Sequence, residues 1–358
     1  MATPRPPDDV RWISTLKSIC ILLVVLYHVT EPGFVNTLAS LSAGRQIAWG
    51  WAALNAQLSP FRMPAFFFVS GLLAQRSIHS RSWRELAGGR LANLLYLYLL
   101  WCVLQWLAVQ FIIHHVTGQR ISPNSNAIYA ASFSELALLS LKGMSSAWYI
   151  YALFGYITLA KAGRNWPRLS LIAGLLLTLI AEMKLVPGWG PQSLCRYAIF
   201  FLMGAHFSAP VIALSRFRAR NVCLWALLLA AAAGARAAGI PFRLIASLPA
   251  ILLAIAACRL MSGHRYAKAL NRLGFITLPI YVMHRIFIEL FGMATIQYAA
   301  QRGWFDSPTL SLLWAIGYPP LMTLLCCAAA LVAWKLTDRG VGQRLYAAAS
   351  RTSRVSTS

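Results

Sequence analysis

The sequence predicts an all-α, polytopic membrane helix bundle of about ten transmembrane helices, with both termini in the cytoplasm. Of the 358 residues, 59% are hydrophobic and 11% are charged, and the mean hydropathy is +0.61. Soluble domains are usually about 45–50% apolar and about 25% charged. The apolar excess and the scarcity of charge both indicate an integral membrane protein.

Apolar runs of membrane-crossing length recur along the whole chain. A spanning helix needs about 20 mostly apolar residues. The short run at 60–76 follows the stretch IAWGWAALNAQL, which either lengthens it or lies along the interface. We predict ten spans, at 13–31, 60–76, 91–115, 145–161, 168–186, 194–210, 219–238, 243–262, 273–294 and 310–335.

The basic residues predict the orientation of these spans. With the N-terminus in the cytoplasm, 22 of the 32 Lys and Arg fall in cytoplasmic segments and nine on the opposite side. Short cytoplasmic loops of membrane proteins carry such an excess, so we expect an N-in, C-in topology. The net charge of +23 is spread over loops rather than gathered in a basic domain, which excludes a nucleic-acid-binding domain. We expect one integral membrane domain over 1–340 and a short cytoplasmic tail over 341–358.

The first span carries ionisable residues that are costly in hydrocarbon and are therefore functional candidates. Lys17 and His28 are eleven residues apart, which places them within about 20° of one helix face and about 16 Å apart along the axis. Glu31 follows His28 by three positions, a spacing that would let it orient the ring. Alternatively, Lys17 extends to the membrane surface and His28 is a packing residue.

Two later segments carry further candidates. FRMPAFFFVSGLL places Arg62 at the outer end of a helix and Ser70 beside Gly71 at a position suited to close packing. A basic loop with Arg81, Arg84 and Arg90 follows, and it would either bind an anionic phosphate donor or serve only to orient the chain.

Six blocks in this order resemble acyltransferase family 3, a family of integral membrane acyltransferases. The blocks are TLKSICILLVVLYHV, FRMPAFFFVSGLL, RLANLLYLYLLW, SSAWYIYALF, LCRYAIFFLMGAHF and LNRLGFITLPIYVMHRIF. The resemblance covers about 13–295. Lys17 stands where Arg is commoner in the family, Arg62 where His is common, and Asn93 where a basic residue is usual.

The resemblance implies roles for individual residues. His28 would be the general base and Glu31 would orient it, while Lys17, Arg81, Arg84 and Arg90 would hold the phosphates of the donor. Five further residues in the matching blocks would contact the substrate: Arg62, Ser70, Trp148, Tyr151 and His284.

The resemblance also implies the reaction and its partners. The family transfers an acyl group from acyl-CoA on the cytoplasmic side to a hydroxyl of a carbohydrate or lipid-linked glycan, and a neutral imidazole is suited to accept the hydroxyl proton. Acetyl-CoA is the favoured donor, although succinyl transfer is not separable from the sequence. We expect acyl-CoA as co-substrate and no permanently bound cofactor, no metal and no nucleic acid. We also expect location in the bilayer of a bacterial inner membrane, with a homodimer as one open oligomeric state.

Two other function classes remain open at this stage. A transporter or flippase of about ten spans would also place His, Glu and Arg in the membrane as a proton relay. Many transporters contain two related halves, and neither LVVLYHV nor MPAFFFVSG recurs in this sequence. A catalytically inactive protein of the same fold is the third alternative.

Overall fold

The computed structural model describes residues 8–240, 243–264 and 267–347, and the described residues contain helices and no strand. The α-helices are α1 (Asp8–Val29), α2 (Arg45–Gln57), α3 (Ser59–Ser80), α4 (Trp83–Leu86), α5 (Ala92–Ile112), α6 (Phe133–Leu141), α7 (Trp148–Ala162), α8 (Pro167–Glu182), α9 (Trp189–Leu214), α10 (Ala219–Ala237), α11 (Arg243–Met261), α12 (Ala267–Leu273), α13 (Thr277–Phe287), α14 (Met293–Gln301) and α15 (Pro308–Thr337). Short π or 3₁₀ segments join or extend them: η1 (Thr30–Phe34), η2 (Val35–Ser40), η3 (Ala87–Leu91), η4 (Ile113–Thr117), η5 (Ala127–Tyr129), η6 (Ile288–Gly292) and η7 (Gly340–Leu345).

Each of the ten predicted spans coincides with helix in the structure. Among the described residues, six helical runs are long and apolar enough to cross a membrane: Arg11–Ser40, Trp83–Thr117, Trp189–Leu214, Arg243–Met261, Thr277–Gln301 and Pro308–Thr337. Two of the other predicted spans form the shorter helices α7 and α8, of 15 and 16 residues. The membrane helix bundle is thus confirmed, while the number of about ten spans and the N-in, C-in topology stay predictions.

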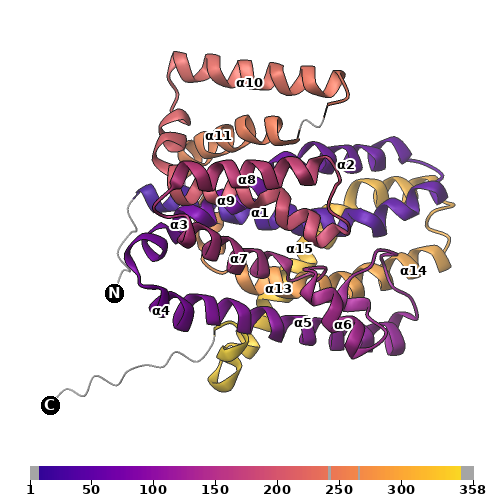
Figure 1. The fold of residues 1–358 in the computed structure, drawn as a ribbon. Coiled ribbons are helices and arrows are strands. Elements are labelled where there is room, and N and C mark those ends of the chain that lie inside the picture. The colour runs from indigo at the N-terminus through magenta and orange to yellow at the C-terminus, as the bar shows by residue number, and fades with distance from the viewer. Residues whose placement is uncertain (1–7, 241–242, 265–266, 348–358) are drawn as a thin grey trace.

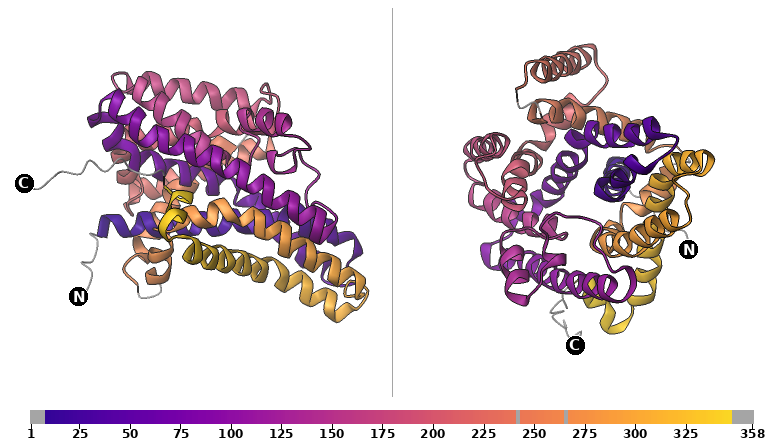
Figure 2. Two further views of the ribbon diagram at one scale, coloured as in Figure 1. Left: turned by 90° about the horizontal axis from the view of Figure 1, so that it is seen from below. Right: turned by 90° about the vertical axis from the view of Figure 1, so that its right-hand side faces the viewer.

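The long helices lie side by side around α1 (Figure 1). Seen along the bundle, α1 lies inside a ring of other helices (Figure 2, right), and it packs against α3, α11, α12, α13 and α15. The predicted span that carries Lys17 and His28 therefore occupies the centre of the molecule.

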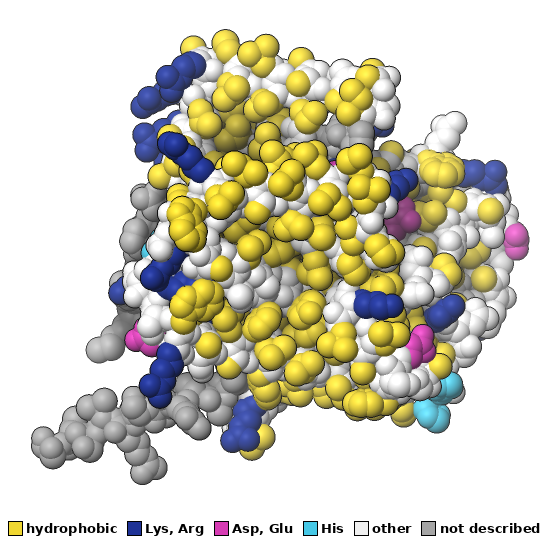
Figure 3. Space-filling view, in the orientation of Figure 1, with side chains coloured by type: hydrophobic (Ala, Val, Ile, Leu, Met, Phe, Trp, Pro, Cys, Tyr) yellow, Lys and Arg dark blue, Asp and Glu magenta, His cyan; other side chains and the backbone are white. Residues whose placement is uncertain are grey.

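The outside of the bundle is apolar along the length of its helices. Hydrophobic side chains cover most of the face in Figure 3, and many of the dark blue Lys and Arg side chains lie toward its left edge. Large apolar side chains such as Leu107, Phe111, Leu313 and Leu324 are exposed. An apolar surface of this extent marks contact with lipid rather than water.

Close backbone contact fixes α3 against α9. Gly71 and Gly204 face the opposite backbone so closely that a Cβ atom would lie 2.1 Å from the carbonyl oxygen of Phe201 and 2.0 Å from that of Phe68, respectively. The predicted close packing at Ser70 and Gly71 is therefore confirmed, and it positions α3 in the wall around α1.

The described part of the predicted tail, 341–347, packs against the bundle. The indole nitrogen of Trp101 donates to the carbonyl oxygen of Leu345 at 2.7 Å, and the Tyr346 hydroxyl contacts the Thr337 hydroxyl at 2.7 Å. The remaining tail residues, 348–358, lie outside the described residues, as do the basic residues Arg5 and Arg265 of the orientation argument.

Candidate functional site

A cavity of about 870 Å³ opens at the end of the bundle where α1 ends. Its walls come from α1, η1, α2, α3, the start of α7, the start of α9, the end of α10, the start of α11, α13 and the segment 122–129. On the predicted topology this is the outer side of the membrane. Of the predicted residues, His28, Glu31, Arg62 and Trp148 line the cavity.

His28 lies in the last turn of α1 and faces His284 of α13. The two ring centroids are 5.2 Å apart with an interplanar angle of 36°. His284 is buried, and its Nδ1 lies 2.6 Å from the carbonyl oxygen of Tyr281. Because a carbonyl oxygen only accepts, this contact assigns the proton of a neutral His284 to Nδ1. His284 thus supports the ring of His28 from behind, whereas His28 itself reaches the cavity.

Glu31 lies beyond the end of the helix. Its backbone is extended, with φ −112° and ψ 123°, so the helical spacing assumed between His28 and Glu31 is wrong. Glu31 interacts electrostatically with Arg62, and no hydrogen bond joins it to His28 within the part of the chain that the structure describes. Because residues before proline favour extended backbone, Pro32 indicates in the sequence that the helix ends near Glu31.

Arg62 is 7% exposed and projects from the first turns of α3. Its Nη1 donates to the side-chain oxygen of Asn55 at 2.8 Å, and its guanidinium carbon lies 4.4 Å from the centroid of the Tyr27 ring. α2 therefore holds the charged group of Arg62 at the cavity wall.

Arg285 belongs to a buried network at the far side of the same cavity. Its Nη2 donates to Glu289 Oε1 at 2.7 Å and to the Tyr129 hydroxyl at 2.8 Å. The Tyr129 hydroxyl also donates to Glu289 Oε1, and the backbone N–H of Ile121 donates to Glu289 Oε2 at 3.1 Å. This network ties the segment between α5 and α6 to α13 and η6.

Two predicted substrate residues pack away from the cavity lining. The Ser70 hydroxyl donates to the carbonyl oxygen of Phe66 at 2.7 Å and lies 2.5 Å from the Tyr149 hydroxyl. Tyr151 stacks on Tyr98 with 4.8 Å between ring centroids. These contacts join α7 to α3 and to α5, and neither Ser70 nor Tyr151 belongs to the described lining of the cavity.

The predicted donor residues lie apart from the cavity lining. Because α1 is an unbroken helix from Asp8 to Val29, Lys17 is about 16 Å from His28 along the axis. Arg81 and Arg84 are exposed, while Arg90 is half-buried and its Nη1 donates to the Ser77 hydroxyl at 3.3 Å.

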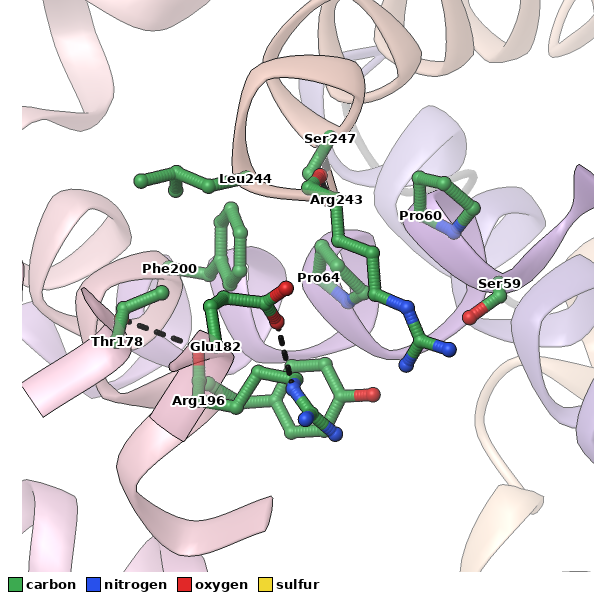
Figure 4. A pocket seen from close by; sticks show the side chains of 11 residues that line it. Ser59, Pro60, Pro64, Thr178, Glu182, Arg196, Phe200, Arg243, Leu244 and Ser247 are labelled. Carbon is green, nitrogen blue, oxygen red and sulfur yellow. Dashed lines mark hydrogen bonds and ion pairs between the residues drawn. The ribbon is translucent and has the colours of Figure 1, made fainter. Parts of the chain in front are cut away.

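A small pocket of about 10 Å³ adjoins the main cavity, and Arg196 and Arg243 line both. In Figure 4 Arg196 pairs with Glu182, and the guanidinium of Arg243 lies toward Ser59. The Arg196 Nε to Glu182 Oε1 distance is 2.7 Å.

Several residues of this site were not predicted from the sequence to have a role. Arg285 and Glu289 carried a usable signal, since opposite charges four residues apart in one span predict an ion pair. Asn55 and Tyr129 carried none, because each meets its partner only through the tertiary packing.

The family of the chain follows from comparison with known proteins. A family model described as an acyltransferase domain, that of acyltransferase family 3, matches residues 10–337. The chain belongs to acyltransferase family 3. It is also 31% identical over 350 residues to the inner membrane protein YcfT of Escherichia coli strain K12, an alignment that covers 96% of this chain and 98% of that protein. No solved structure matches the chain.

These findings confirm the predicted family. The chain is an integral inner-membrane protein, as its relative and its apolar helices show, and it carries an acyltransferase domain.

Proposed function

We propose that the protein is an O-acyltransferase that moves an acyl group, with acetyl favoured, from acyl-CoA to a hydroxyl of a carbohydrate or related cell-envelope acceptor. The observation that carries the proposal is the position of His28, half-buried at the wall of a large cavity and supported by His284. Membership of an acyltransferase family favours this function over transport.

In the proposed reaction, a neutral His28 takes the proton of the acceptor hydroxyl as its oxygen attacks the thioester carbon. The new C–O bond forms through a tetrahedral intermediate, the C–S bond then breaks, and the proton passes from His28 to the departing thiolate. Acyl-CoA thus becomes CoA and the acceptor becomes an ester.

Arg285 is the residue that we propose to stabilise the negative oxygen of the intermediate. It acts electrostatically on His28 and lines the cavity. Its Nη2 is held by Glu289 and Tyr129, and its Nη1 donates to no described residue and is not enclosed by protein. A fixed cation beside the reacting carbon supplies the stabilisation that acyl transfer needs.

We propose that the donor enters from the side of the bundle where α1 begins, and that Lys17, Arg81, Arg84 and Arg90 would bind its phosphates. Lys161 supports this arrangement, because its ammonium group donates to the carbonyl oxygens of Ile78, at 2.8 Å, and of Arg81. These bonds hold the beginning of the basic loop against the bundle.

The function is tested by comparing envelope glycans from cells with and without the protein, by mass analysis and NMR. We expect acyl esters that disappear with the gene and that purified protein in nanodiscs restores from labelled acetyl-CoA. Identical glycans, together with no label transfer to any envelope fraction, would contradict the proposal.

A further inference from the structure

The charges around the cavity are unequal. Glu31 is the one acidic residue in the described lining, which contains five arginines. These are Arg62, Arg196, Arg236, Arg243 and Arg285. Two further carboxylates lie behind the wall, where Glu289 pairs with Arg285 and Glu182 pairs with Arg196 at 2.7 Å each. Three carboxylates therefore oppose five guanidinium groups.

Arg62 and Arg243 are the two arginines of this set that we consider as a ligand site. Neither forms an ion pair with a described carboxylate, and the two groups are close enough to interact electrostatically. Arg62 is 7% exposed and uses one nitrogen to bind Asn55. Its other guanidinium nitrogens donate to no residue that the structure describes, and none is enclosed by protein.

This arrangement costs free energy while the cavity is empty. A buried guanidinium without a direct ion pair is destabilising, a cost that Glu31 near Arg62 offsets only in part, and a second cation nearby adds repulsion. An anion placed between the two groups would remove both costs and would receive charge-assisted hydrogen bonds from planar donors. Asn55 and the Tyr27 ring already hold Arg62 in place, so little ordering is needed on binding.

We propose that the cavity takes an anionic acceptor, in which a carboxylate or phosphate group lies near the hydroxyl that is acylated. This inference rests on the proposed function. Arg62 and Arg243 hold the anionic group, while His28 and Arg285 face the reacting hydroxyl. Trp148 and Trp189 also line the cavity and suit a sugar, because aromatic rings pack on its apolar faces.

The test measures binding to the full-length protein in nanodiscs of phosphatidylcholine. The probes are trigalacturonic acid and its neutral methyl ester, which has the same sugars and hydroxyl groups. The variants are Arg62→Gln and Arg243→Gln, of which the second is exposed and removes a charge with little effect on folding. Arg220→Gln is the matched control, because Arg220 is exposed on α10 and lies outside the described lining.

We expect the acid to bind with a Kd at least about tenfold lower than that of the ester, the effect of one charge-assisted hydrogen bond. Each cavity variant should remove that preference and Arg220→Gln should keep it. Equal binding of acid and ester, or a preference that survives both cavity variants, would overturn the anion site.

Two further arms separate other sources of the anion. If adenosine 3′,5′-bisphosphate competes with the acid and both cavity variants weaken its binding, the arginines serve the donor and the assignment to the acceptor is overturned. If phosphatidylglycerol in the nanodisc abolishes binding of the acid, the site belongs to lipid and the assignment is again overturned. No competition in either arm supports it.

Acyl transfer to the two probes separates this inference from the proposed function. Equal transfer to the acid and the ester would overturn the anionic acceptor and leave the proposed function standing. Selective binding of the acid, with no transfer to any acceptor, would contradict the proposed function and leave the anion site standing.

Discussion

His28 and His284 occupy different positions relative to the cavity and therefore have different expected roles. His28 reaches the cavity, whereas His284 is 1% exposed and anchored to the carbonyl oxygen of Tyr281. The 5.2 Å between ring centroids lets His284 limit the orientations of His28. We expect His28 to exchange the proton and His284 to act as a positioning residue.

Replacing His284 tests this division of roles. In His284→Ala the ring of His28 loses its support, so kcat should fall about 10–10²-fold, the usual effect of a small misplacement of a reacting group. The KM values for donor and acceptor should change little. Steady-state kinetics at matched folded concentration measures both, with His206→Ala as control, because His206 packs beside His79 and lies outside the described cavity lining. A raised acceptor KM at normal kcat would instead make His284 a binding residue.

At the scale of elements, the Arg285–Glu289 pair connects α13 and η6 to the segment between α5 and α6. Glu289 is completely buried and receives hydrogen bonds from Tyr129, Arg285 and Ile121. Charged groups in such a site are stable only while they are paired.

Removing the charge of Glu289 should therefore destabilise the fold. We expect Glu289→Gln to lower the free energy of unfolding by about 3–5 kcal/mol, because it leaves Arg285 buried without a counterion. Denaturant titration in detergent measures the change. Glu135→Gln is the control, since Glu135 is exposed and accepts the backbone N–H of Ala131 at 2.8 Å. Equal stability of the two variants would contradict the structural role of the network.

The backbone contact between α3 and α9 should make Gly204 intolerant of a larger side chain. Gly204→Ala would force its Cβ atom against the carbonyl oxygen of Phe68, 2.0 Å away. Separating the two helices should cost about 1–3 kcal/mol of stability. Gly155→Ala is the matched control, because Gly155 lies inside α7 with no atom within 4 Å of the new Cβ. Thermal unfolding in nanodiscs compares them, and a neutral Gly204→Ala would show that the helices are not in backbone contact.

The described part of the molecule is a ring of helices around the central helix α1 (Figure 2). α1 carries Lys17 near its middle and His28 in its last turn. If the predicted orientation holds, the cavity opens to the outer side and the basic loop faces the cytoplasm. On the proposed function, acyl-CoA and the acceptor would then reach the protein from opposite sides of the membrane.

Reporter fusions test this orientation. Fusions after residues 40, 120, 190, 240 and 303 should all report the outer side, because 22 of the 32 basic residues fall in the segments predicted to be cytoplasmic. Cytoplasmic activity from any of these fusions would contradict the ten-span topology and the side assigned to the cavity.

The helices of this fold could be predicted because each is specified by its own residues. A membrane requires long apolar runs with internally satisfied backbone groups, and every predicted span coincides with helix. The end of α1 was missed although Pro32 marked it, because the helical period was extended through Glu31.

The arrangement of the site could be predicted only in part. His28 and His284 could each be identified as a candidate from its own predicted span, the first and the ninth. Their contact could not be predicted, because the two residues are 256 positions apart in the sequence. The Arg62–Asn55 and Glu289–Tyr129 bonds likewise depend on how helices pack. Local sequence patterns contain no information on such pairs.

The most direct test of the central claim is acyl transfer by His28→Ala in nanodiscs, with labelled acetyl-CoA and envelope glycan acceptor, at a folded concentration matched to the unmodified protein. The side chain lines an open cavity, so its removal should leave the fold intact, while loss of the general base should lower turnover about 10²–10⁴-fold. Turnover close to that of the unmodified protein would contradict the role of His28.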